Sequence, residues 1–244
     1  MSFFLSIVIP FYNEENCISK SLERIVEYFS NKSYNYELIL VDDGSIDSSL
    51  NKVRRFKENL GDEIRNCKFS ILVNKENKGK GYSIRRGILT SVGKYVLFTD
   101  ADLAVPIEEF EKLLNYIEND DFNIAIGSKY MYGFEIVSKK NILRRITGKI
   151  FNFLVRTIVR LDFKDTQCGF KIFDRKSVNF LFPYLKIDDF SFDIEILYLA
   201  NKKGLRIREV PIRYSFSDAS KVNIIKSSIS MFFNLMKLKK IHKS

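Results

Sequence analysis

Short apolar segments alternate with longer amphipathic segments along the first half of the chain. The apolar segments have strand length and end in polar or glycine residues, which indicates buried β-strands. Between them, apolar residues recur near a period of 3.6, which indicates helices that bury one face. The expected strands are residues 5–10, 37–41, 69–73, 95–99 and 123–127, and the expected helices are residues 17–29, 47–59, 81–92 and 107–118.

Alternation of strands and helices predicts an α/β fold with a mostly parallel central sheet and helices on both faces. In such sheets ligands bind beyond the carboxyl ends of the strands. The 244 residues fit one large domain or two small ones. Because no repeat and no Gly/Ser-rich linker interrupts the chain, we expect one continuous domain followed by a tail.

The second half has a different pattern. A long helical pattern over residues 141–160 carries Phe151, Phe153 and Val155, which we expect to be exposed beside several cations. A strand at 170–173, a helix at 192–203 and a strand at 205–214 follow. Residues 222–241 form a basic amphipathic pattern, typical of an interfacial helix on an anionic membrane. Packing on the protein itself or in a homo-oligomer is the alternative.

Composition excludes several classes of protein. Apolar residues make up 45% and charged residues 29% of the chain, so disorder and small disulfide scaffolds are ruled out. No run is long and apolar enough for an obvious membrane span, and the first residues do not resemble a secretory signal. The three cysteines are odd in number and far apart, as in a reducing cytoplasm. Since the single histidine is His242, Ser-His-Asp, Cys-His and His-based zinc sites are excluded.

The net charge of +10 indicates an anionic partner. Six lysines and no acid occur in residues 219–244. A nucleic-acid binder is one alternative, but the sequence shows no RRM, KH or helix-turn-helix pattern. A nucleotidyltransferase of similar layout is another, and it would release pyrophosphate.

Acidic residues follow two expected strands. Asp42 and Asp43 can bind ribose hydroxyls or a base N–H, or they can cap the local turn. Asp100 and Asp102 would project to one side of an extended backbone and converge on a cation such as Mg²⁺. A solvated loop before Pro106 is the alternative.

Two further segments carry weaker indications. The glycine-rich turn around Lys80 precedes an expected helix with cations, which suits phosphate binding, although it matches neither a P-loop nor G-x-G-x-x-G. Asp193 and Glu195 open the helix at 192–203, where a carboxylate can act as a general base. Favourable interaction with the helix dipole explains acids at that position equally well.

Seven strings taken together resemble the family 2 glycosyltransferases, and within them the dolichyl-phosphate β-glucosyltransferase and mannosyltransferase group. They occur in family order between about residues 5 and 221 and lie at residues 10–15, 41–45, 77–81, 100–102, 127–130, 165–171 and 192–195. The string at 165–171 is more similar to the glucosyl branch. The resemblance implies a GT-A fold over residues 1–218, with a nucleotide-sugar half (1–128), an acceptor half (129–218) and the basic tail (219–244).

The resemblance also implies an inverting transfer from a nucleotide sugar, with UDP-glucose the expected donor and Mg²⁺ or Mn²⁺ the expected cofactor. Asp102 would hold the metal on the diphosphate, and Asp193 aligns with the base of relatives that use hydroxyl acceptors. Basic positions that meet a lipid phosphate in the group correspond to Lys129, Arg144, Arg145 and Lys221, with lysine at 129 in place of the more usual arginine. The donor would be bound by Pro10, Tyr12, Glu14, Asp42, Asp43, Lys80, Asp100, Ala101 and Asp102.

A polyprenyl phosphate acceptor fits this pattern, because its oxygen is already anionic and needs cations more than a base. A sugar hydroxyl in cell-surface polysaccharide synthesis is the alternative, and it would make Asp193 indispensable. We expect a cytoplasmic protein, peripheral at the inner face of the membrane, that does not bind nucleic acid.

Overall fold

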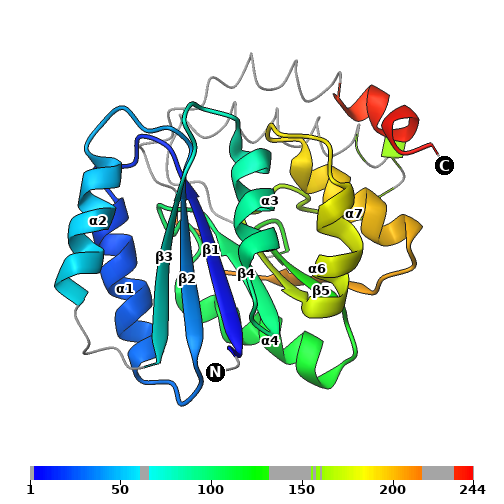
Figure 1. Ribbon diagram of the computed structural model, residues 1–244. Coiled ribbons are helices and arrows are strands. Elements are labelled where there is room, and N and C mark those ends of the chain that lie inside the picture. Colours follow the sequence, from blue (N-terminus) through cyan, green and yellow to red (C-terminus); the bar gives the residue numbers. More distant parts are fainter. Residues whose placement is uncertain are drawn as a thin grey trace.

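The computed structural model describes residues 3–60, 66–131, 155, 158–159, 161–215 and 234–243. Its centre is a seven-stranded sheet with the order β3-β2-β1-β4-β6-β5-β7 (Figure 1). The strands are β1 Leu5–Phe11, β2 Tyr36–Asp42, β3 Cys67–Val73, β4 Tyr95–Thr99, β5 Ile124–Ser128, β6 Phe170–Asp174 and β7 Ile207–Pro211. Only β6 runs antiparallel to its neighbours, β4 and β5, so the other six strands end at the same edge.

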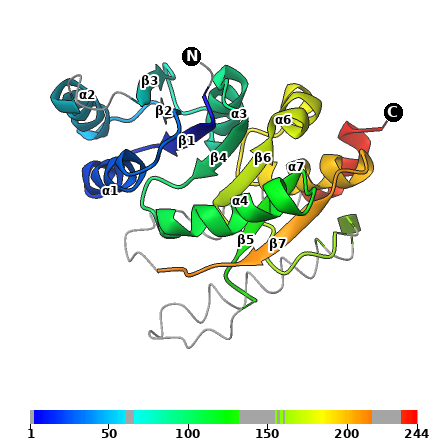
Figure 2. The same cartoon turned by 90° about the horizontal axis from the view of Figure 1, so that it is seen from below.

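Helices cover both faces of the sheet, as the alternating pattern predicts. The helices are α1 Ile18–Ser30, α2 Ser49–Leu60, α3 Lys80–Thr90, α4 Phe110–Asn119, α6 Arg175–Leu181 and α7 Phe192–Lys202, with short 3₁₀ turns η2 Ile107–Glu109 and η3 Phe182–Tyr184. Alternate residues of β1 point to opposite faces. Ile7 packs with α1, α2 and α4, whereas Val8 packs with α3, α6 and α7. Seen from below, α1 and α4 lie on one side of the sheet and α3 and α6 on the other (Figure 2).

The first half matches the expected elements to within a few residues. The second half departs in two places. Helix α6 was not expected, although Asp174 caps it by accepting a hydrogen bond from the Ser177 backbone N–H at 2.6 Å. The last strand is also shorter than expected at both ends. At its start, the Leu205 backbone N–H donates to Ala200 O and belongs to the turn that follows α7.

The structure tests the expectations for two apolar segments, and it covers only part of each segment. Val155 is fully buried with Val159 in the core on the α3 face, so the expectation that it is exposed is wrong. Leu235 and Leu238 of the C-terminal segment, residues 234–243, are buried in the same core, so this part of the tail packs on its own domain. Phe151, Phe153 and residues 216–233 lie outside the described residues.

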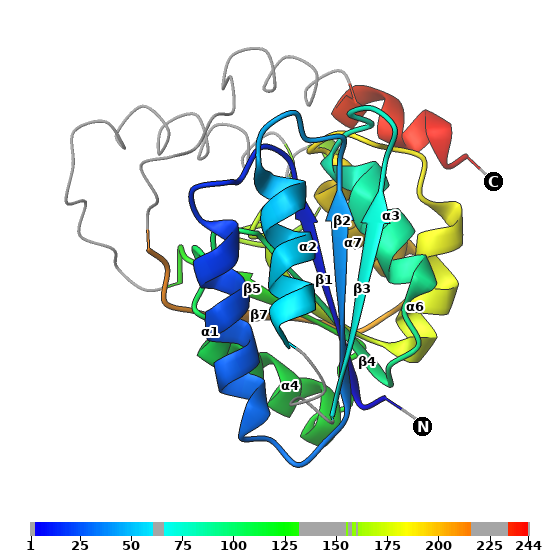
Figure 3. The same cartoon turned by 60° about the vertical axis from the view of Figure 1, so that its left-hand side comes forward.

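The C-terminal segment lies beside α7 in Figures 1 and 2. Lys202 Nζ of α7 donates to the His242 carbonyl at 2.8 Å. Figure 3 brings α1 and α2 forward, with the edge strand β3 and its neighbour β2 beside them. Within the part of the chain described here, we find no helix with the length and apolarity that a membrane crossing requires.

Candidate active site

The loops after β1 and β2 are tied together at the carboxyl edge of the sheet. Asn13 Oδ1 accepts hydrogen bonds from the Ile46 and Asp47 backbone N–H groups, and the Asn13 N–H donates to Ser45 Oγ at 3.0 Å. Asn13 adopts a left-handed conformation with φ of 57°, which asparagine tolerates better than most residues. The two loops are therefore joined. Tyr12 and Glu14 lie in the first of them, Pro10 is a buried residue of β1, and donor binding by these three residues stays a prediction.

The two carboxylates at the end of β2, Asp42 and Asp43, are buried and accept hydrogen bonds from other groups of the protein. Asp42 Oδ1 accepts from the Ser45 N–H at 3.0 Å. Asp43 Oδ1 accepts from Asn74 Nδ2 and the Lys78 N–H, and its Oδ2 accepts from the Gly79 N–H. The Asp42 contact lies within the local turn, as the turn-capping alternative states, whereas the partners of Asp43 lie 31 to 36 residues further along the chain. Nucleoside binding by Asp42 and Asp43 stays a prediction. Asp43 also holds the start of α3 at this edge.

The glycine-rich turn before α3 is not a cradle of open backbone amides. The Lys78 and Gly79 N–H groups bond to Asp43, and the Gly81 and Tyr82 N–H groups bond to Asp188 O at 2.8 and 3.2 Å. A Cβ on Gly79 would lie 2.3 Å from Asp188 O. The glycines are therefore explained by close packing against residues 187–189, and the phosphate-cradle interpretation of this turn is wrong for these four amides.

Lys80 leaves that turn toward Asp100. Its Nζ lies 2.5 Å from Asp100 Oδ1, and the Phe190 ring centroid is 6.0 Å away. Burial acts to lower the pKa of Lys80, but attraction to Asp100, Asp193 and Asp102 outweighs it and the pKa is raised. Lys80 is therefore a permanent cation among three carboxylates.

Asp100 and Asp102 lie in a turn rather than in extended backbone, so the expected alternation of side chains does not hold. Strand β4 ends at Thr99, and the Leu103 N–H donates back to Asp100 O at 3.2 Å. Asp102 Oδ1 accepts from the Ala104 N–H at 3.1 Å. Both carboxylates nevertheless act electrostatically on Lys80 and on Tyr214, and the intervening Ala101 is buried. The turn thus presents two carboxylates to one region.

Gly169 leaves just enough space for Asp100. The Asp100 N–H donates to Gly169 O at 3.2 Å, and a Cβ on Gly169 would lie 2.0 Å from Asp100 Oδ2. No side chain at position 169 is compatible with this carboxylate position. The loop before β6 is therefore part of the site.

Asp193 sits behind Lys80 in a buried ion pair. Its Oδ1 lies 2.6 Å from Lys171 Nζ, which also donates to Cys168 O at 2.6 Å. Lys171 is fully buried and Asp193 is 3% exposed. Burial raises the pKa of Asp193, with Lys171 and then Lys80 opposing it. The charges therefore alternate in the order Lys171, Asp193, Lys80 and Asp100.

Lys129 is enclosed rather than open. Its Nζ lies 3.1 Å from Asp165 Oδ2 and within 5.1 Å of the Tyr130 and Tyr214 ring centroids. The ion pair with Asp165 helps raise the pKa of Lys129 against the effect of burial. Burial raises the pKa of Tyr214 to about 12. Arg144, Arg145 and Lys221 lie outside the described residues.

Two chemically important residues of this arrangement, Lys171 and Asp165, were not among the expected site residues. Both lie in the string 165–171. A charged residue next to Cys168 and Phe170, in a segment with a strand pattern, could have indicated that the charge is buried and paired. Glu195 has a structural role. It is fully buried and accepts hydrogen bonds from the Lys186 and Ile187 backbone N–H groups at 2.9 Å.

The donor set fits a divalent cation that takes most of its ligands from a substrate. Among the described residues, no cluster of three or more His, Cys, Asp or Glu side chains could hold a metal by itself. Mg²⁺ typically uses one or two protein carboxylates and completes its shell with phosphate oxygens and water. Asp102 and Asp100 supply that number of carboxylates at the carboxyl edge of the sheet.

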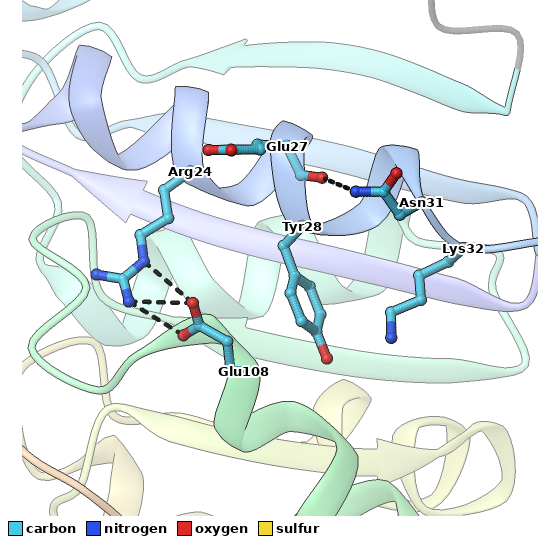
Figure 4. A pocket seen from close by; sticks show the side chains of 6 residues that line it. All are labelled: Arg24, Glu27, Tyr28, Asn31, Lys32 and Glu108. Carbon is cyan, nitrogen blue, oxygen red and sulfur yellow. Dashed lines mark hydrogen bonds and ion pairs between the residues drawn. The ribbon is translucent and has the colours of Figure 1, made fainter.

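A groove along α1 is a separate feature (Figure 4). Of its charged side chains, Arg24 pairs with Glu108 at 3.0 Å, and Lys32 pairs with Glu111 outside the lining. None of the expected site residues lines it. The groove is therefore not a candidate active site.

The sequence model described as Glycosyl transferase family 2 matches residues 6–182. A dolichyl-phosphate beta-glucosyltransferase of Dictyostelium discoideum is 36% identical, and the alignment covers 97% of this chain and 74% of the relative. The protein of that description from Saccharomyces cerevisiae is 37% identical, with 96% and 73% covered.

Solved structures show the fold. Glucosyl-3-phosphoglycerate synthase from Mycobacterium tuberculosis in complex with UDP has a TM-score of 0.70 at 16% identity, covering 99% of this chain and 82% of that one. The mannosyltransferase PcManGT from Pyrobaculum calidifontis, in complex with GDP-Man and Mn²⁺, has a TM-score of 0.62 at 16% identity, with 100% and 66% covered. The chain belongs to the family 2 glycosyltransferases and has their GT-A fold.

Proposed function

We propose that this glycosyltransferase is an inverting, metal-dependent enzyme that moves glucose from UDP-glucose to dolichyl phosphate or another polyprenyl phosphate. Relatives that match nearly the whole chain are named dolichyl-phosphate beta-glucosyltransferases. Family membership rules against the nucleotidyltransferase and the nucleic-acid binder that composition left open.

The burial of Asp193 is the observation that favours a phosphate acceptor over a sugar hydroxyl. A general base must come within about 3 Å of the proton that it removes, or reach it through one water. Asp193 is 3% exposed and paired with the buried Lys171 ammonium. A phosphate monoester has its second pKa near 6, so its oxygen is largely anionic at pH 7 and needs no base. The site therefore suits a phosphate acceptor better than a sugar hydroxyl.

In this proposal the nucleoside is bound at the carboxyl ends of β1, β2 and β4, by Pro10, Tyr12, Glu14, Asp42, Asp43 and Ala101. Asp102 would hold Mg²⁺ or Mn²⁺, and a bound cation would neutralise the charge that grows on the departing diphosphate. Asp100, held by Lys80 and Gly169, lies near the ribose and the sugar. Lys80 adds a fixed positive charge beside the leaving group, where it is worth most in a water-poor site.

The acceptor phosphate would be met by cations of the second half. Lys129 is restrained by Asp165 and the two tyrosine rings, so we assign it a fixed charge rather than a flexible contact. Arg144, Arg145 and Lys221 remain proposed partners of the phosphate. Since the acceptor is a lipid, we propose that the enzyme works while peripherally bound at the inner face of the membrane. Salt-sensitive flotation with anionic liposomes is the expected result.

The purified chain is expected to convert UDP-glucose and a polyprenyl phosphate into UDP and a glucosyl-phosphate lipid when Mg²⁺ or Mn²⁺ is present. GDP-mannose and an oligosaccharide acceptor serve as comparison substrates, and EDTA removes the metal. Transfer to the oligosaccharide but not to the lipid phosphate would overturn the acceptor assignment. Equal turnover with EDTA would overturn the metal dependence.

Replacing Gly169 with alanine is expected to lower transfer about a hundredfold. The added methyl group would overlap Asp100 Oδ2 and push this carboxylate away from Lys80. Gly204→Asn is the control, because nothing lies within 4 Å of a Cβ at Gly204 and asparagine tolerates its φ of 69°. Wild-type turnover by a well-folded Gly169→Ala protein would show that the position of Asp100 does not matter.

A further inference from the structure

The C-terminal segment is bound at both of its ends. At its start, Asn234 Nδ2 donates to Asp189 Oδ2 at 2.7 Å. At its end, His242 Nε2 lies 2.6 Å from Glu195 Oε1. Leu235 and Leu238, between these two contacts, are 1% exposed. The segment is therefore packed onto residues 185–195 by both apolar and polar contacts.

Glu195 links His242 to the loop before α7. Its two carboxylate oxygens accept from the Lys186 and Ile187 backbone N–H groups at 2.9 Å. Glu195 is completely buried, so these partners satisfy a carboxylate that water does not reach. Loss of the His242 contact would leave the Lys186 N–H to satisfy Glu195 Oε1 and would loosen the hold of this carboxylate on the loop.

The same loop holds the turn that carries Lys80. Asp188 O accepts from the Gly81 and Tyr82 N–H groups, and Asp188 Oδ1 lies 2.8 Å from Arg85 Nη2. Arg85 Nη1 also donates to Leu185 O at 2.9 Å. Because a Cβ on Gly79 or Gly81 would collide with Asp188 O or Ile187 O, the two loops are in direct backbone contact. A shift of residues 185–189 would therefore move Lys80 relative to Asp100.

We infer that Asn234 and His242 are positioning residues for the donor site: by docking the C-terminal segment on residues 185–195 they hold Lys80 against Asp100. This inference rests on the proposed function only in taking Lys80 and Asp100 as donor residues. The side-chain hydrogen bonds described above join Asn234 to Asp189 and His242 to Glu195, so both residues act on Lys80 through the loop. Affinity for the nucleotide sugar thus depends on a segment more than 130 residues away in sequence from Asp100.

The test uses the full chain with His242→Ala, His242→Gln and Asn234→Ala, and with Lys240→Ala as a control from the exposed face of the segment. Amide hydrogen exchange reports on the loop contact without any substrate. We expect the Gly81 and Tyr82 amides to exchange about three- to tenfold faster in His242→Ala and Asn234→Ala, as befits one lost hydrogen bond. Lys240→Ala should leave these amides unchanged.

Transfer assays add a second readout. The KM for the nucleotide sugar is expected to rise by about the same three- to tenfold factor with kcat nearly unchanged, and His242→Gln should restore part of the loss by keeping a hydrogen bond to Glu195. Unchanged Gly81 and Tyr82 exchange in both alanine variants would overturn the inference, whatever their activity. A wild-type protein that transfers no glucose would overturn the proposed function alone, since the exchange result stands without it.

Discussion

Replacing Asp102 with asparagine is expected to lower glucosyl transfer by about a thousandfold while the fold is retained. Asparagine keeps the oxygen that accepts from the Ala104 N–H, so the turn after β4 should hold its shape. What is lost is the negative charge proposed to hold the cation on the leaving diphosphate. Steady-state transfer from UDP-glucose at saturating Mn²⁺ measures the effect.

The control is Asp120→Asn. Asp120 is an exposed carboxylate that follows α4 and precedes β5, at the opposite edge of the sheet. Its loss of charge is the same, and we expect transfer within about twofold of wild type because exposed substitutions rarely change more. Undiminished turnover by Asp102→Asn would remove this residue from metal binding and with it the central assignment of the site.

Replacing Lys171 with methionine is expected to lower the free energy of unfolding by about 3–5 kcal/mol at pH 7, because it leaves a buried carboxylate without its cation. Methionine has a similar length, so packing against Phe98 should be kept. The double variant Lys171→Met with Asp193→Asn should recover most of that loss, since neither buried charge remains. Denaturant unfolding of wild type, both single variants and the double variant measures the coupling.

The stability that Lys171→Met loses relative to wild type is expected to depend on pH, and to be smaller in acid. The pKa of Asp193 is already raised by burial, and removing Lys171 raises it further. When the pKa of a carboxyl group is higher in the folded state than in the unfolded state, its ionised form destabilises the fold. This destabilisation disappears once the pH is low enough to protonate the group in both states. The Lys171→Met deficit should therefore shrink as the pH falls from 7 toward about 4, the ordinary aspartate range. A deficit that grows on acidification would contradict the buried pair.

The double variant also tests whether Asp193 acts as a base. Loss of a general base typically lowers turnover by about 10²–10⁴-fold. If the acceptor is a phosphate, the double variant should keep transfer to polyprenyl phosphate within about tenfold of wild type, once its fold is shown to be intact. A loss of about a thousandfold with this acceptor would restore Asp193 as the base.

Local pattern was enough to locate the strands and the chemistry at their ends. In β1, Ile7 and Val8 face opposite sides of the sheet, which gives a period of two, and the buried face of α1 gives a period of 3.6. Both periods can be read from residues that are close together in sequence. Since six strands are parallel, their carboxyl ends meet at one edge, and the acidic residues that end β2 or follow β4 lie at that edge. The seven strings at 10–195 indicated the family because each is a short run of consecutive residues, which the sequence displays without any knowledge of the tertiary structure.

Pairing between distant residues was decided only by the tertiary structure. Lys171 meets Asp193 because β6 is inserted between β4 and β5 and α7 packs across it, and no local period encodes that strand order. The turn at Asp100 follows from its contact with Gly169, which replaced the extended backbone that strand alternation implies. Asp43 and His242 likewise acquire their partners through loops far apart in sequence. Periodicity reports which side of an element is buried, whereas the identity of the group on the other side depends on how the elements are arranged in space.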